Sequence, residues 1–110
     1  MSFDPRVFFL VAKSLGSGSP DEAALRTAVG RSYYAAFLVA RDKLGLTSER
    51  DRVHYKVESA LKRLNLAQGQ KLGQLKRHRV EADYKLATTA NWNNVWQEAS
   101  SLSNDLLTKL

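Results

Sequence analysis

The sequence predicts an all-α fold, an antiparallel bundle of about five helices, in a single domain spanning residues 1–110. Apolar residues recur at three- and four-residue steps along most of the chain, and no segment alternates apolar and polar residues as a strand does. Hydrophobic residues make up 44% of the chain and charged residues 25%, a balance typical of a folded globular protein. Short links separate the periodic segments, which favours antiparallel packing of neighbouring helices.

The first predicted helix begins at the N-terminal end of the chain. Asp4 is suited to its N-cap and Pro5 to its first position, where a proline loses no helical hydrogen bond. Phe3 and Phe8 have the spacing of a hydrophobic staple across this cap. Gly16 is expected to end the helix in a left-handed conformation.

The second predicted helix is the longest and the most central. Ser19, Pro20 and Glu22 have the pattern of a capping box, and Gly45 is expected to follow the last turn. Gly30, in its middle, costs about 1 kcal/mol relative to alanine, which we interpret as close approach by a neighbouring helix. The apolar stripe of this helix comprises Leu25, Ala28, Val29, Ala36, Phe37, Ala40 and Leu44.

Three further helices follow. The third is expected to start at Thr47 or Ser48, the fourth to span about 67–86 and the fifth to run from residue 92 towards 110. Their apolar stripes are Val53, Val57, Leu61 and Leu64; then Leu72, Leu75, Ala82 and Leu86; then Trp92, Val95, Trp96, Ala99, Leu102 and Leu106.

The composition restricts the classes of function. A formal net charge of +6 favours polyanionic partners such as RNA, DNA or nucleotides, although it also suits a merely solvated surface. The absence of cysteine excludes disulfides and thiolate chemistry and fits a cytoplasmic location. The longest apolar run is too short to span a membrane, so we expect no membrane partner.

Arg79 is the conspicuous polar residue, because it falls within the apolar stripe of the fourth predicted helix. A charge on a core-facing stripe requires compensation, and Asp83, one turn later on the same face, is the nearest candidate partner. One interpretation is a structural ion pair. The other is an arginine held ready for a phosphate, whose oxygens match its planar fork.

Further basic and aromatic residues are candidates for nucleic-acid binding. Arg31, Tyr34 and Arg41 share an edge of the second predicted helix, where a base could stack and its phosphate be held. A tyrosine packed in the core is the alternative for Tyr34. Lys76 and Arg77 are either solvated or serve as phosphate contacts.

Neither a metal site nor a cofactor site is expected. The chain has two histidines, His54 and His78, and their spacing cannot make a metal site; His78 should also point about 100° away from Arg79. A nucleophilic serine turn and a glycine-rich phosphate loop are both missing from the sequence.

Three segments together resemble the small prokaryotic HEPN-domain proteins in order and spacing. They are Arg-Ser-Tyr-Tyr-Ala-Ala-Phe at 31–37, His-Tyr-Lys-Val at 54–57 and Arg-Val-Glu-Ala-Asp-Tyr at 79–84. The resemblance implies a helical bundle that forms a homodimer. It also implies that this chain is the toxin and that its partner, a nucleotidyltransferase, is the antitoxin. It also implies a metal-independent ribonuclease whose Arg-x4-6-His motif lies at the dimer interface.

Carried over residue by residue, this motif is incomplete. Arg79 matches the motif arginine, but Tyr84 and Lys85 occupy the positions where the histidine is expected. Tyr84 stands at the position of the motif histidine, but a phenol is a poor general base at neutral pH. The other candidate for proton transfer is His54, which would act across the bundle or the dimer.

Two hypotheses follow from these observations. In the first, the chain is an endoribonuclease of toxin type in which Arg79 stabilises charge on the phosphate. In the second, it is a non-catalytic helical module that binds RNA, a nucleotide or a protein, with Arg79 and Asp83 as a structural or interface pair.

Overall fold

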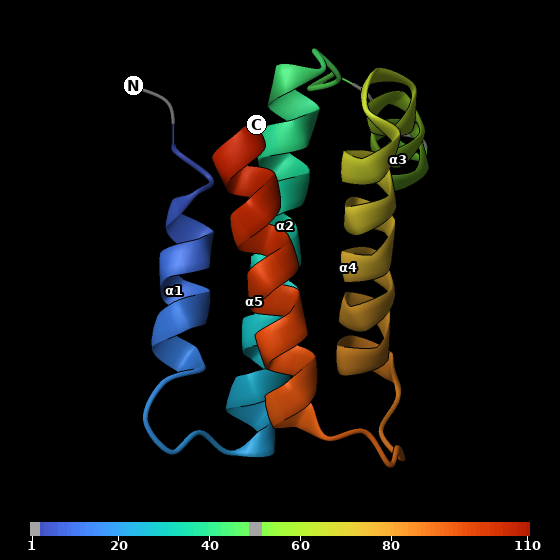
Figure 1. Ribbon diagram of the computed structural model, residues 1–110. Coiled ribbons are helices and arrows are strands. Elements are labelled where there is room, and N and C mark those ends of the chain that lie inside the picture. The colour runs from blue at the N-terminus through green and yellow to red at the C-terminus, as the bar shows by residue number, and fades with distance from the viewer. Residues whose placement is uncertain (1–2, 49–51) are drawn as a thin grey trace.

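The computed structural model describes residues 3–48 and 52–110, and these residues form five helices (Figure 1). They are α1 (Val7–Leu15), α2 (Glu22–Lys43), α3 (Val53–Leu64), α4 (Leu66–Tyr84) and α5 (Trp92–Lys109). Because no strand occurs within the described ranges, the prediction of an all-helical bundle is confirmed.

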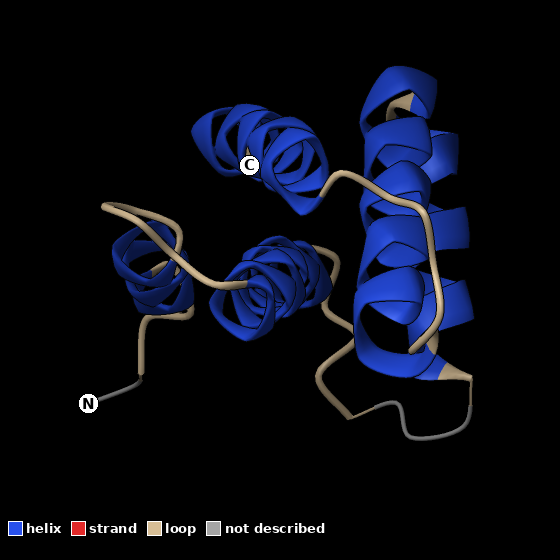
Figure 2. Ribbon diagram, turned by 90° about the horizontal axis from the view of Figure 1, so that it is seen from below, coloured by secondary structure: helices blue, strands red, loops and turns tan. Residues whose placement is uncertain are grey.

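The helix α2 lies at the centre of the bundle and contacts all four other helices. In Figure 1, α1 and α2 run in opposite directions, whereas α2 and α5 run in the same direction. Figure 2 shows α1, α2 and α5 end-on, beside one another. In Figure 1, α3 is instead seen nearly along its own axis, so it crosses the other helices and packs mainly on α4.

Small side chains bring α2 and α5 close together. Ser32 and Ser103 are both fully buried, and the Ser103 hydroxyl donates a 2.8 Å hydrogen bond to the backbone oxygen of Ser32. The Ser32 hydroxyl in turn donates to the oxygen of Val29, so neither buried hydroxyl lacks a partner. The core around this contact comprises Leu25, Val29, Tyr33, Ala36, Phe37, Ala40, Val57, Leu61, Leu72, Leu75, Ala82, Trp92, Ala99 and Leu106.

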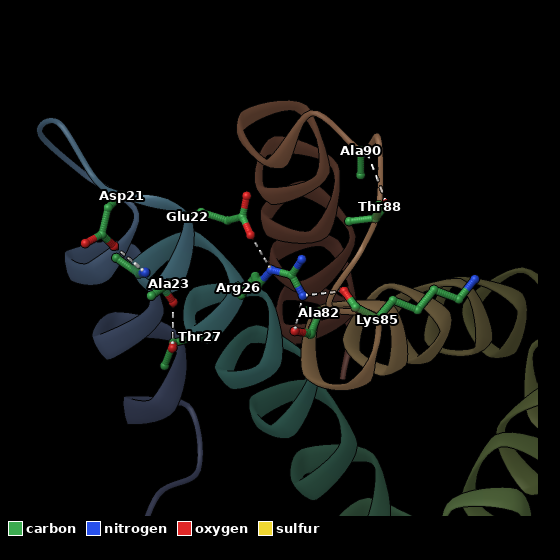
Figure 3. A network of polar contacts seen from close by, with 10 residues as sticks. Asp21, Glu22, Ala23, Arg26, Thr27, Ala82, Lys85, Thr88 and Ala90 are labelled. Atoms are coloured by element: carbon green, nitrogen blue, oxygen red, sulfur yellow. Dashed lines mark hydrogen bonds and ion pairs between the residues drawn. The ribbon is translucent and has the colours of Figure 1, made fainter.

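The start of α2 differs from its prediction. Asp21, rather than Ser19, is the N-cap, and its carboxylate accepts a 2.8 Å hydrogen bond from the backbone N–H of Ala24 (Figure 3). Glu22 does not complete a capping box but forms an ion pair with Arg26, one turn later. The predicted capping box is therefore wrong, because Asp21 and not Ser19 stands at the position where the chain enters the helix.

Glycine conformations correct the predicted end of α1. Gly16 adopts a right-handed conformation with φ of −86°, and Gly18 is the residue with positive φ, at +73°. The left-handed residue therefore lies two positions later than expected, within the turn. Gly45, with φ of +72°, follows α2 as predicted. The rings of Phe3 and Phe8 lie 5.2 Å apart, as predicted, but the prediction of Asp4 as N-cap and Pro5 as first helical residue is wrong, because α1 begins at Val7 with Arg6 as its N-cap.

The start of α3 also differs from its prediction. The helix begins at Val53, after Arg52 in a left-handed conformation with φ of +53°, so neither Thr47 nor Ser48 is its N-cap. The part of the predicted helix at 49–51 lies outside the described residues. The helix α4 ends at Tyr84, and Leu86, predicted to continue its apolar stripe, is 87% exposed.

Arg26 closes the corner between α4 and α5 (Figure 3). Its Nη1 donates hydrogen bonds to the backbone oxygens of Ala82, at 3.1 Å, and Lys85, at 2.7 Å. The last turn of α4 has no basic residue of its own, so this arginine from α2 supplies the cation that a helix C-terminus favours. Its guanidinium also stacks 4.4 Å from the ring of Trp92. These contacts fix the end of α4 that carries Asp83.

Candidate functional site

Arg79 is turned into the bundle, as the sequence predicts, and it has the predicted partner. Its side chain is 17% exposed, and its Nε lies 3.0 Å from Oδ2 of Asp83, an ion pair in which the N–H is not aligned with the oxygen. Its Nη2 donates a 3.1 Å hydrogen bond to the hydroxyl of Tyr34 on α2. The guanidinium is thus held from two helices.

Three tyrosine rings surround this guanidinium. The central carbon of Arg79 lies 5.3 Å from the ring centre of Tyr34, 5.9 Å from that of Tyr33 and 6.0 Å from that of Tyr84, distances at which cations attract aromatic faces. Tyr84 itself is 69% exposed. No described residue accepts a hydrogen bond from Nη1 of Arg79, which leaves donors for a ligand.

His54 belongs to the same cluster. Its Nδ1 lies 2.6 Å from the hydroxyl of Tyr33, and its ring stacks on Phe37 at 4.2 Å. Burial raises the pKa of Tyr33 strongly, so this hydroxyl keeps its proton at neutral pH. Which of the two atoms donates in the bond depends on the imidazole tautomer. In the tautomer that carries its proton on Nδ1, Nε2 is the ring nitrogen that can accept a proton.

The charge state of His54 follows from its surroundings. Burial lowers the pKa of His54, and the positive charges of Arg79 and Lys76 lower it further. The imidazole therefore stays neutral at neutral pH beside the guanidinium. Of the candidates for proton transfer, His54 is thus brought into electrostatic contact with Arg79, although 25 positions separate the two in the sequence.

This pKa shift predicts a pH dependence of stability. Unfolded chains protonate histidine at about pH 6.5, whereas folded His54 protonates at lower pH, so the unfolded state binds more protons in between. The contribution of His54 to the free energy of unfolding is thus fully present above about pH 7, and it is lost as the pH falls towards the pKa of His54 in the folded chain. Urea unfolding should give a steeper decline between about pH 7 and 5.5 for the wild type than for His54→Phe. Equal declines would contradict this environment.

A cleft of about 340 Å³ opens beside the Arg79 cluster, between α2 and α4. It brings together two of the predicted nucleic-acid contacts, Arg31 and Tyr34, with Asp83. Arg31 is exposed, and its guanidinium carbon lies 5.5 Å from the ring of Phe8 and 6.0 Å from that of Tyr34. The remaining lining residues are Ala23, Arg26, Thr27, Gly30 and Ala82.

The other predicted contacts lie elsewhere. Lys76 and Arg77 line a second cleft, of about 520 Å³, between α3 and α4. Arg41 lines neither cleft, and its buried Nε has no hydrogen-bond partner among the described residues. His78 points away from Arg79, as predicted, and its Nε2 lies 3.3 Å from Glu98 on α5. The sequence placed Arg31, Tyr34 and Arg41 on one edge of the helix, but the structure puts only Arg31 and Tyr34 in the cleft and leaves Arg41 outside it.

Sequence reasoning did not single out Tyr33 or Arg26. Tyr33 is the buried partner of His54, and Arg26 holds the end of α4; both contacts join residues far apart in the chain. Within residues 3–48 and 52–110, no group of three or more histidines or carboxylates is placed to hold a metal ion. No helix in these ranges combines the length and apolar character that a bilayer span requires.

Comparison of the chain with protein-family models, curated proteins and solved structures gave no match. The resemblance to HEPN-domain proteins therefore depends on the three sequence segments at 31–37, 54–57 and 79–84. The structure places residues from all three segments, namely Tyr34, His54 and Arg79, around one cluster.

Proposed function

We propose that this chain is a HEPN-like module that binds RNA through Arg79 and the adjoining cleft, as the cytoplasmic, toxin-type partner of a nucleotidyltransferase antitoxin. The observation that carries the RNA part is the guanidinium of Arg79. It is held by Asp83 and Tyr34, yet its Nη1 has no protein partner among the described residues. A fixed fork of this kind suits a phosphate, because little rotamer entropy remains to be lost on binding.

Charge around the cleft supports an anionic ligand. Arg31 lines the cleft with no carboxylate within ion-pair distance among the described residues, and the chain carries a net charge of +6. Phosphate contacts provide most of the affinity of proteins for nucleic acids, and aromatic rings beside them stack bases. Tyr34, whose ring faces both Arg31 and Arg79, meets the second requirement.

Metal-independent cleavage of the bound RNA is the second candidate function. It is favoured by the position of His54 within electrostatic reach of Arg79. In this role Arg79 stabilises charge on the phosphate, the neutral imidazole of His54 accepts the proton of the attacking 2′-hydroxyl, and the hydroxyl of the exposed Tyr84 donates a proton to the leaving 5′-oxygen. A non-catalytic binding module is the alternative, and the cleavage assay below separates the two.

A homodimer is part of this proposal. Large apolar side chains are exposed at the end of α4 and just beyond it: Val80 by 39%, Tyr84 by 69% and Leu86, which follows the helix, by 87%. All three are within seven residues of Arg79 in the chain, and exposed large apolar side chains are typical of protein interfaces. Pairing of two copies here would bring two Arg79 clusters together, as the resemblance to HEPN proteins implies.

The experiment that tests the proposal measures binding of a fluorescent single-stranded RNA to the purified chain. If Arg31 and Arg79 both contact phosphates, the affinity should fall roughly sevenfold between about 50 and about 200 mM salt. Incubation with total RNA in the presence of EDTA distinguishes cleavage from binding. Affinity that does not respond to salt, or an absence of binding at about 50 mM salt, would contradict the RNA-binding proposal.

A further inference from the structure

Most helix-associated glycines in this chain have a packing reason. A Cβ atom on Gly69 would lie 2.6 Å from backbone atoms of Lys62, where α3 and α4 meet. A Cβ atom on Gly73 would lie 2.9 Å from the carboxylate of Glu58, and one on Gly16 would lie 2.3 Å from the indole of Trp96. Each of these glycines therefore lets two elements approach more closely than alanine would allow.

Gly30 differs from these glycines, because close packing does not require a glycine at its position. It lies in the middle of α2 and is buried, yet a Cβ atom there would meet, among the described residues, only Oδ1 of Asp83, at 3.6 Å. That distance is an ordinary van der Waals contact, so alanine fits the folded chain. The sequence-based interpretation that a neighbouring helix approaches Gly30 closely is thus wrong. Glycine is the weaker helix former, so packing and helix stability together favour alanine at this position.

The space over Gly30 is the floor of the cleft between α2 and α4. Because Gly30 lies in mid-helix, its backbone N–H is used within α2, and Gly30 offers the cleft neither a side chain nor a free donor. Asp83 faces this floor with Oδ1, while its other oxygen, Oδ2, pairs with Arg79. The guanidinium of Arg31 and the ring of Tyr34 complete the lining on the α2 side.

We propose that the cleft over Gly30 holds one nucleobase that carries an amino group, lying flat against the α2 backbone. This inference rests on the proposed RNA-binding function and names its preferred ligand. The amino group of adenine, cytosine or guanine donates to Oδ1 of Asp83, and the nucleotide's phosphate contacts Arg31. Uracil is disfavoured because its single donor on this edge, N3–H, lies between two carbonyl oxygens that the carboxylate repels.

The same chemistry is available from an unpaired nucleotide of RNA and from a free nucleotide. The probes are therefore oligo(A) and oligo(U) of about 12 nucleotides, a length within the range of site sizes for single-strand binders, and adenosine monophosphate. Wild-type protein should bind oligo(A) at least about tenfold more tightly than oligo(U), which corresponds to one well-placed base contact.

The decisive variant is Gly30→Ala, whose methyl group fills the floor. It should raise the thermal midpoint of unfolding by about 4–8 °C, because alanine is the better helix former. It should also weaken oligo(A) binding about tenfold and leave oligo(U) binding unchanged. The matched control is Ser101→Ala, which places alanine at an exposed position of α5 and should not change either affinity.

Each outcome decides the inference. Equal binding of oligo(A) and oligo(U), an unchanged affinity of Gly30→Ala for oligo(A), or a lowered midpoint would overturn it while leaving RNA binding intact. If neither oligonucleotide binds but adenosine monophosphate does, and Gly30→Ala weakens that binding, the base site stands and the RNA function fails. If none of the three probes binds, both proposals fail.

Discussion

Replacing Arg79 with alanine is expected to weaken RNA binding by about 10- to 100-fold, the loss typical of a charge-assisted hydrogen bond to phosphate. The free energy of unfolding should fall by only about 1 kcal/mol, because the pair with Asp83 is partly exposed and the bond to Tyr34 is a single hydrogen bond. Anisotropy with labelled RNA and urea unfolding of the same samples measure the two effects separately.

The control for this prediction is Arg79→Lys. Lysine keeps the positive charge but not the planar fork that reaches Asp83, Tyr34 and a phosphate at once. We therefore expect an affinity between those of the wild type and the alanine variant. If alanine at this position leaves both affinity and cleavage unchanged, Arg79 and Asp83 are a structural pair and the ligand is bound elsewhere.

Replacing Trp92 with alanine is expected to have the largest effect on stability, a loss of about 3–5 kcal/mol. Trp92 is 5% exposed at the start of α5, and its ring lies beneath the guanidinium of Arg26. The loss would be a large fraction of the free energy of unfolding of a small domain. Urea unfolding, with the slope compared between variants, measures it.

Trp92→Phe serves as the matched control. The buried indole N–H of Trp92 has no hydrogen-bond partner among the described residues, so phenylalanine loses ring area but no hydrogen bond. We expect this variant to keep most of the stability that alanine loses. A loss below about 1 kcal/mol for Trp92→Ala, well under the usual range for a buried aromatic, would show that the corner held by Arg26 does not depend on this ring.

Most of the fold could be predicted from the sequence, because each helix has a continuous apolar stripe. The boundaries could be predicted less well, since several residues compete for one role. Ser19 and Asp21 are both acceptable N-caps, and only the path of the chain makes Asp21 the acceptor for the first turn of α2. Leu86 matches the period of α4, but the helix has ended before it, so the match has no structural meaning.

The site could be predicted only where its contacts are local. Arg79 and Asp83 lie one turn apart on α4, and helical spacing alone pairs them. The bonds of Tyr34 with Arg79 and of Tyr33 with His54 join residues that are 45 and 21 positions apart, so they depend on how α2, α3 and α4 pack. The same holds for Gly30, whose free space becomes evident only with Asp83 in place across the cleft.

Contact between Arg79 and RNA is tested most directly by nuclear magnetic resonance of the arginine side-chain Nε–H groups. On titration with single-stranded RNA, the Arg79 signal should shift with saturation, and Arg31 should shift with it because both guanidinium groups flank the ring of Tyr34. The signal of Arg6, which bonds to the backbone oxygen of Leu107 near the other end of the chain, should not move. RNA binding that shifts other arginines and leaves Arg79 unchanged would contradict the account.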